Sequence, residues 1–137
     1  MKQRPKTDPF LLEVLRNAFD TIAEEITLTI IRTAYSQIVR DSLDFSTALC
    51  DAEGRTFAQG VCTPMHLGSF LDALKNMLAE VGDDIDPEDY FIMNDPYAAA
   101  GQHLPDIYVV KPVFFLGELK GWSTTLAHHS DVGGIVA

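Results

Sequence analysis

Two short segments of the sequence combine histidines with aspartates at spacings that could build a metal or catalytic site. His103 and Asp106 lie three positions apart in the first segment, and His128, His129 and Asp131 lie together in the second. Imidazole nitrogens and carboxylate oxygens are common ligands of catalytic metals such as zinc and manganese, which keep a further coordination position open for water. We therefore predict that the two segments share one site.

The first segment is predicted to be a loop that leads into a strand. It runs from Asn94 to Asp106 and contains Pro96, Gly101 and Pro105, which together exclude a regular helix. Such a loop can aim an imidazole and a carboxylate at one point. A lone histidine near a strand end, or an aspartate beside a proline, would be interpreted as structural. The prediction of a site therefore rests on the cluster as a whole.

The second segment follows a predicted strand and raises the question of which histidine takes part. Adjacent side chains on an extended strand point to opposite faces, so His128 and His129 cannot both reach the same metal. Spacing alone pairs His129 with Asp131. A bulge before the two following glycines would reverse that pairing. The choice between the two histidines stays open on these grounds.

Other residues that could do chemistry give weaker signals. His66 lies at the start of a predicted helix, where a cap or a buried contact is favoured over a ligand, although a helix N-terminus can bind an anion. Cys50 and Cys62 match neither a disulfide framework nor a zinc motif, and we expect both to be reduced. The sequence has no glycine-rich nucleotide loop and no serine-nucleophile motif.

Composition limits the classes of protein to consider. The 137 residues include 20 acidic and 10 basic side chains, which gives a formal charge of −10, and 47% are apolar. This charge argues against nucleic acid and anionic membranes as partners, because both attract clustered Lys and Arg. No apolar run reaches the roughly 18 to 20 residues that span a bilayer, and no signal-peptide pattern is present, so we expect a cytoplasmic location.

Apolar periodicity predicts a long first helix and a second helix. Thr7 or Asp8 can cap the first, Pro9 suits its first turn, and its apolar stripe continues to about Val39. The second helix is predicted from His66 to Val81, and Gly82 lies where a C-terminal cap belongs.

The remaining segments are strand-like. Residues 45–59 predict a β-hairpin around the turn residues 51–54. Further strands are predicted at Tyr90–Met93, Ile107–Val110, Val113–Leu116 and Leu119–Leu126, with Gly117-Glu118 as a tight connection. Two helices and five or six strands indicate an α+β fold with a mostly antiparallel sheet. The uncapped apolar C-terminus suggests that this is part of a larger fold.

The chain resembles the hydantoinase B/oxoprolinase family. The resemblance is carried by Asn94-Asp95-Pro96-Tyr97, His103-Leu104-Pro105-Asp106 and Ala127-His128-His129-Ser130-Asp131-Val132-Gly133-Gly134. Supporting matches lie at residues 40–46, 51–54 and 65–69. It extends from about Pro9 to the last residue, and family members are much longer, so residues 1–137 correspond to an N-terminal portion. One departure is Ala98-Ala99-Ala100-Gly101-Gln102, where the family has a glycine-rich loop.

The resemblance implies a B component of an ATP-dependent cyclic-amide hydrolase that opens hydantoin or 5-oxoproline. ATP and Mg would be used by a hydantoinase A-type subunit or domain, so we expect a hetero-oligomer, and the chain alone is expected to be inactive. The carboxylase relatives carry a metal on residues matching His103, Asp106 and His128, which selects His128 over His129.

Further roles also follow from the resemblance. The metal is expected to be Zn or Mn, with His129 and Asp131 as supporting or general acid/base groups, and Asn94, Asp95 and His66 as substrate contacts. The runner-up function is a subunit of an ATP-dependent ketone carboxylase for acetone or acetophenone. A third is a non-catalytic scaffold that docks the A-type partner through the apolar face of the first helix.

Overall fold

A single antiparallel sheet forms the centre of the computed structural model, which describes residues 7–60, 63–98 and 103–130. The strand order is β2-β1-β5-β4-β3. The strands are β1 (Phe45–Asp51), β2 (Thr56–Gln59), β3 (Phe91–Met93), β4 (Asp106–Phe115) and β5 (Glu118–His128). The helices are α1 (Pro9–Thr33), α2 (Gln37–Arg40), α3 (Pro64–Leu67) and α4 (Ser69–Val81). The predicted α+β fold with an antiparallel sheet is confirmed.

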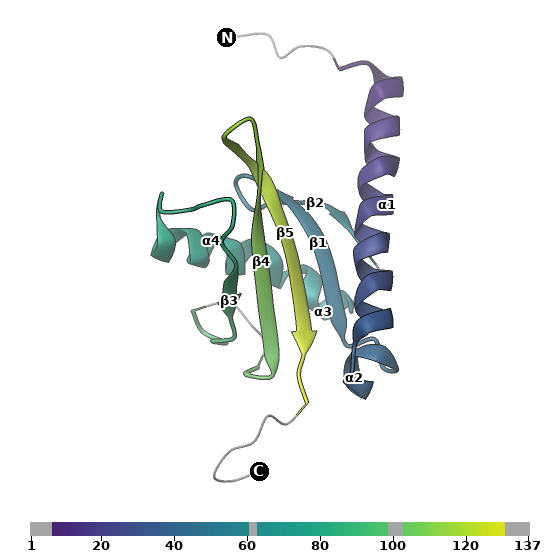
Figure 1. The fold of residues 1–137 in the computed structure, drawn as a ribbon, viewed down its shortest axis with the longest axis vertical. Coiled ribbons are helices and arrows are strands. Elements are labelled where there is room, and N and C mark those ends of the chain that lie inside the picture. Colours follow the sequence, from purple (N-terminus) through teal and green to yellow (C-terminus); the bar gives the residue numbers. More distant parts are fainter. Residues whose placement is uncertain (1–6, 61–62, 99–102, 131–137) are drawn as a thin grey trace.

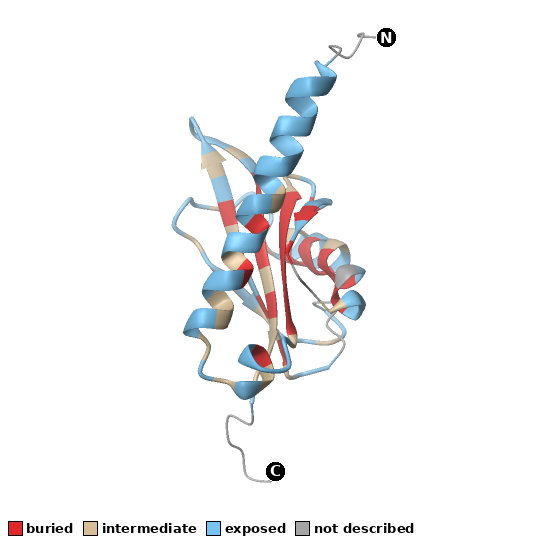
Figure 2. Cartoon of the chain, turned by 90° about the vertical axis from the view of Figure 1, so that its right-hand side faces the viewer, coloured by how far each residue is buried: buried red, intermediate tan, exposed pale blue. Residues whose placement is uncertain are grey.

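The two longest helices lie on opposite faces of the sheet (Figure 1). Side chains of α4 form the main core with the sheet, and Figure 2 shows that buried residues gather in the sheet and in α4. The core contains Ala48, Cys50, Phe70, Ala73, Leu74, Met77, Tyr108, Val110, Trp122 and Leu126. In contrast, only Ala23 and Thr27 of α1 are buried.

Helix α1 begins as predicted and ends earlier than predicted. The Asp8 carboxylate accepts a hydrogen bond from the Phe10 N–H at 2.9 Å, and Pro9 occupies the first turn. The helix ends at Thr33 because Ala34 takes an extended conformation (φ −68°, ψ 130°), so the expected continuation to Val39 is wrong. Threonine hydroxyls along its second half donate to carbonyls four residues back, which weakens a helix that is already rich in β-branched residues.

Helix α1 approaches the sheet through a small polar contact. The Thr27 and Thr47 hydroxyls lie 2.9 Å apart, and the Thr47 hydroxyl also donates to the Ala23 carbonyl at 3.3 Å. Gly60 lies beside this contact, and a Cβ at position 60 would lie only 2.0 Å from Thr27 Oγ1. The missing side chain of Gly60 therefore sets how closely α1 can approach β1.

The second predicted helix is divided into α3 and α4 at Gly68. The expected start at His66 is wrong, because the first helical turn already begins at Pro64. At the break, the Ser69 hydroxyl donates to the His66 carbonyl at 2.7 Å and accepts from the Tyr108 hydroxyl at 2.6 Å. These two bonds join the break to Tyr108, near the start of β4.

Strands β4 and β5 form one long hairpin, which corrects two predictions. The two strands expected at 107–110 and 113–116 are one strand that continues through Pro112. Proline is tolerated there because the pairing of β3 with β4 stops at Val110, so one side of β4 is an edge. The turn consists of Leu116 and Gly117, with φ of 52° and 79°, rather than Gly117 and Glu118.

A β-bulge interrupts the same hairpin. Val113 pairs with Gly121 and Phe114 pairs with Leu119, which leaves Lys120 without a partner in the register. Beyond the bulge the pairing is regular as far as Asp106 opposite His128.

Among the helices that the structure describes, none combines the length and the apolar character that a membrane span requires.

Candidate functional site

Three of the predicted site residues meet at one end of the sheet. The register of β4 and β5 pairs Asp106 with His128, and His103 lies just before β4. His103 Nε2 is 3.3 Å from Asp106 Oδ1, and the rings of His103 and His128 have centroids 4.9 Å apart. A turn in which the Asp106 N–H donates to the His103 carbonyl at 3.0 Å holds the first pair in place.

Two atoms of this cluster are buried without a hydrogen-bond partner. They are Asp106 Oδ1 and His128 Nδ1, although buried polar atoms in folded proteins are nearly always paired. An unpaired carboxylate oxygen and an unpaired imidazole nitrogen are the types of ligand atom that zinc and manganese bind in proteins. Among the described residues, however, no three His, Cys, Asp or Glu side chains are already arranged as a set of metal ligands. The ligand assignments stay a prediction.

His66 lies in the same region and is buried. Its side chain on α3 is held by Ser46 on β1, whose hydroxyl is 2.8 Å from His66 Nδ1 and accepts the Thr63 N–H at 3.2 Å. The other ring nitrogen, Nε2, is 3.8 Å from Asp44 Oδ1. The structure thus shows the buried contact favoured by the sequence, and the role of His66 as a substrate contact stays a prediction.

The electrostatics of His66 connect it to the cluster. Burial lowers the pKa of His66, the nearby carboxylates of Asp106 and Asp44 partly counter this, and His103 and His128 lower it further. The imidazole is therefore neutral at neutral pH, so one of its ring nitrogens carries a proton and the other is a hydrogen-bond acceptor.

Lowering the pH should destabilise the chain through His66. Its folded pKa is depressed, so the unfolded state takes up a proton below the ordinary value of 6.5 while the folded state resists it. The contribution of His66 to the free energy of unfolding is fully present above pH 6.5 and is lost as the pH falls toward the folded pKa. Urea unfolding at pH 7.5 and 5.5 should show a drop in the free energy of unfolding that is smaller in His66→Asn. An equal drop in His66→Asn would contradict this, and His129→Asn provides the matched control.

His129 makes a backbone contact just beyond the end of β5. The His129 N–H donates to the Pro105 carbonyl at 2.9 Å, which extends the contact between the two segments beyond the last strand pair. Its ring centroid is 6.4 Å from that of His128, and both histidines border a cavity on the α1 side of the sheet. Asp131 lies outside the described residues, so its predicted role is not placed.

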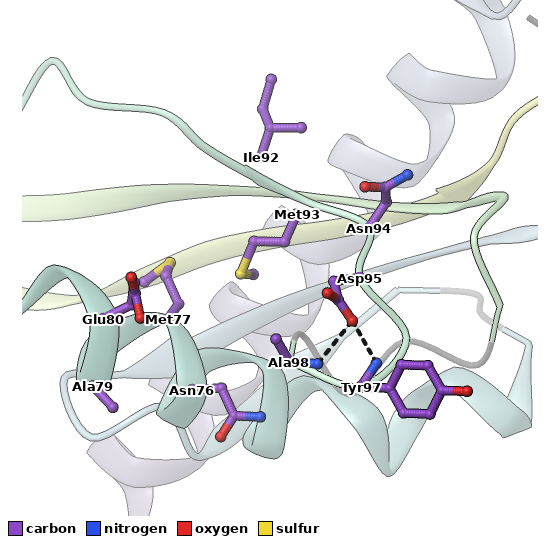
Figure 3. A pocket seen from close by; sticks show the side chains of 10 residues that line it. All are labelled: Asn76, Met77, Ala79, Glu80, Ile92, Met93, Asn94, Asp95, Tyr97 and Ala98. Carbon is purple, nitrogen blue, oxygen red and sulfur yellow. Dashed lines mark hydrogen bonds between the residues drawn. The ribbon is translucent and has the colours of Figure 1, made fainter.

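Asn94 and Asp95 border a different hollow, a groove of about 730 Å³ between α4 and the end of β3 (Figure 3). Asp95 Oδ1 accepts the N–H groups of Tyr97 at 2.7 Å and Ala98 at 3.0 Å, and these bonds lower the pKa of the carboxyl. The Asn94 amide donates to the Leu104 carbonyl at 3.2 Å, which ties this loop to the His103 loop. The lining residues are Asn76, Met77, Ala79, Glu80, Ile92, Met93, Asn94, Asp95, Tyr97 and Ala98.

The predicted site residues thus form two groups. His66, His103, Asp106 and His128 gather at the end of β4 and β5, while Asn94 and Asp95 lie in the groove beside α4. Sequence reasoning missed the roles of Asp44 and Ser46, which hold His66. Their only signal is their place in residues 40–46, one of the segments that carry the family resemblance.

The family model described as hydantoinase B/oxoprolinase matches residues 8–137. The chain belongs to the hydantoinase B/oxoprolinase family. Among its relatives is the caprolactamase subunit beta of Pseudomonas jessenii, to which the chain is 40% identical over 94% of the chain's length. It is 37% identical to the 5-oxoprolinase of Dictyostelium discoideum over 93% of its length.

Solved structures show the same relationship. Acetone carboxylase in its nucleotide-free state matches with a TM-score of 0.84 at 26% identity over 95% of the chain. The ATP-dependent caprolactamase of Pseudomonas jessenii also matches with a TM-score of 0.84, at 36% identity over 96% of the chain. The chain spans only 22% of the caprolactamase subunit beta, 10% of the 5-oxoprolinase and 17% of the acetone carboxylase chain.

Proposed function

We propose that this chain is the metal-holding portion of a B-type component of an ATP-dependent cyclic-amide hydrolase. The observation that carries the proposal is the register that sets Asp106 opposite His128, each with a buried atom that lacks a partner. The names caprolactamase and 5-oxoprolinase of the sequence relatives support a cyclic amide as the substrate class.

In this proposal His103, Asp106 and His128 hold a divalent Zn or Mn ion, which supplies polarisation of a carbonyl or a more acidic bound water. The chain's own groups orient the substrate and move protons. The neutral His66 lies close enough to the site to interact electrostatically with Asp106, and the Ser46 hydroxyl fixes the orientation of its ring. His129 lies at the strand end, where it can exchange a proton as general acid or base.

The groove beside α4 is the proposed binding region for the part of the substrate that extends away from the metal. Asn94 offers an amide group and Asp95 an ionised carboxylate that is already oriented by two backbone N–H groups. An amide and a carboxylate are suited to pairing with N–H and C=O groups in that part of the substrate. ATP and Mg would be used by a hydantoinase A-type partner, in line with the subunit names of the caprolactamase and hydantoinase relatives.

A second candidate is a subunit of an ATP-dependent ketone carboxylase. It is favoured by the match to acetone carboxylase, whose TM-score of 0.84 equals that of the caprolactamase. Activity assays of the full complex separate the two. ATP-dependent consumption of 5-oxoproline, hydantoin or caprolactam without bicarbonate supports the hydrolase, and bicarbonate-dependent consumption of a ketone supports the carboxylase.

The metal content of the purified chain tests the proposal directly. Elemental mass spectrometry should find about one equivalent of zinc or manganese per chain. His103→Ala should lower this metal content by about tenfold or more, because the substitution removes the imidazole nitrogen that lies next to Asp106. His129→Ala, whose backbone contact to Pro105 is kept, provides the matched control and should retain the metal.

Two outcomes would contradict the metal proposal. Equal metal in wild type and His103→Ala would show that any ion is held elsewhere. No metal in the wild type after dialysis against zinc and manganese would favour the scaffold reading, in which the histidines are structural.

A further inference from the structure

In the part of the chain that the structure describes, no helix covers β4 on one face of the sheet. Helix α1 packs against β1 and β2, while α4 covers the opposite face of the sheet. On the α1 side, outward side chains of β4 remain exposed, with 36% of Val109, 45% of Val113 and 63% of Phe115 accessible. Figure 1 shows α1 on the β1–β2 side of the sheet, away from β4, and Figure 2 shows that α1 is exposed along almost its whole length.

The uncovered area is a groove that follows β5. Its floor consists of the small side chains that β5 directs to this face, and its walls are α1 on one side and β4 on the other. Two cavities of about 380 and 620 Å³ lie along it. The floor and wall residues are Phe19, Ile22, Ile26, Ile107, Val109, Val113, Gly121, Ser123, Thr125 and Ala127.

The dimensions and chemistry of the groove fit a helix. Neighbouring strands lie about 4.8 Å apart, so two strands are about as wide as the 8 to 10 Å that separate the axes of packed helices. Helix α1 lies over β1 and β2, and the next two strands, β5 and β4, therefore leave space for one more helix beside it. Small side chains on the floor allow close approach of a helix backbone. Neither cavity is lined by Asp or Glu, although the chain has 20 of them, so the groove suits an apolar helix face.

We propose that this groove holds an apolar helix from the remainder of the B-type polypeptide, packed beside α1 over β5 and β4. The matched segment is 22% of the caprolactamase subunit beta, so most of that polypeptide is left to supply the helix. A covalently linked helix reaches the groove at an effective concentration of about millimolar, which a second copy or a separate subunit does not match. One end of this groove adjoins the proposed metal site, because His128 and His129 also line its larger cavity, but the test of the groove depends on neither metal nor turnover.

Cysteine accessibility tests the proposal. Val109→Cys and Val113→Cys are made in the isolated chain and in a caprolactamase subunit beta whose matching segment is replaced by this chain. Maleimide labelling, followed by peptide mass spectrometry, should be fast in the isolated chain and slower by about tenfold or more in the chimera. Glu88→Cys, at an exposed charged position before β3, is the matched control and should react equally in both.

The other outcomes overturn the proposal. Equal labelling of both groove cysteines in isolated chain and chimera would show an open face. Protection that rises with the concentration of the isolated chain would assign the groove to a second copy, and protection that needs the A-type subunit would assign it to that partner. If circular dichroism shows that the chimera is unfolded, the same cysteines are placed at the matching positions of the unaltered caprolactamase subunit, with the same criteria.

Discussion

Asp106→Asn should make the metal-free chain more stable and at the same time abolish its stabilisation by zinc or manganese. Asp106 is 1% exposed, and its Oδ1 has no hydrogen-bond partner although His103 Nε2 lies 3.3 Å away, so the folded chain bears the cost of a buried carboxylate that is compensated only in part. Asparagine keeps the shape and removes the charge, which should raise the free energy of unfolding by about 1 to 3 kcal/mol. The same change removes the proposed anionic ligand.

Urea unfolding with and without metal measures both effects. A wild-type chain at a metal concentration 100 times Kd should gain about 2.7 kcal/mol, and Asp106→Asn should gain almost nothing. Asp95→Asn is the matched control, because Asp95 is an exposed carboxylate in the groove beside α4 and should leave the metal-dependent gain unchanged. A metal-dependent gain in Asp106→Asn as large as in the wild type would remove Asp106 from the ligand set.

Gly60→Ala should unfold a large fraction of the chain. A methyl group at position 60 would lie 2.0 Å from Thr27 Oγ1, 2.5 Å from Thr47 Oγ1 and 2.7 Å from the Ala23 carbonyl. Relief requires α1 to move away from β1, which breaks the contact between the two threonines. We expect a loss of about 3 kcal/mol or more, at the upper end for overpacking of a buried site.

Gly68→Ala separates this steric effect from the general cost of replacing glycine. Nothing lies within 4 Å of a Cβ built at position 68, and its φ of −72° suits any residue. The midpoint of urea unfolding of Gly68→Ala should stay close to that of the wild type. A midpoint for Gly60→Ala that matches that of Gly68→Ala would show that α1 is not held at this distance.

The periodic patterns predicted the elements of the fold better than their ends. The start of α1, the β1–β2 hairpin and the end of α4 follow from capping and turn residues near in sequence. The breaks at Ala34 and Gly68 do not follow from apolar periodicity, and the break at Gly68 is tied to a distant part of the chain. At Gly68, for example, the carbonyl of His66 is satisfied by Ser69, which is itself held by Tyr108 on β4.

The position of His128 beside Asp106 could not be worked out from spacing, because the register depends on both the turn and the bulge. A turn at Gly117-Glu118 would set His129 opposite Asp106, and a turn at Leu116-Gly117 without a bulge would set Ala127 there. The observed turn and the unpaired Lys120 together select His128. The family resemblance supplied the choice that the residues alone left open.

The strand order has a consequence for the time course of folding. The β1–β2 and β4–β5 hairpins close over short stretches of chain, whereas Phe45 of β1 must find Ala127 of β5 across most of the sequence. Closing so long a loop is slow relative to forming the hairpins. Ser46 is carried on β1, and Asp106 and His128 on the other hairpin. The three proposed ligands can therefore meet as soon as the β4–β5 hairpin forms, whereas His66 and its partner Ser46 join them only when the two hairpins dock.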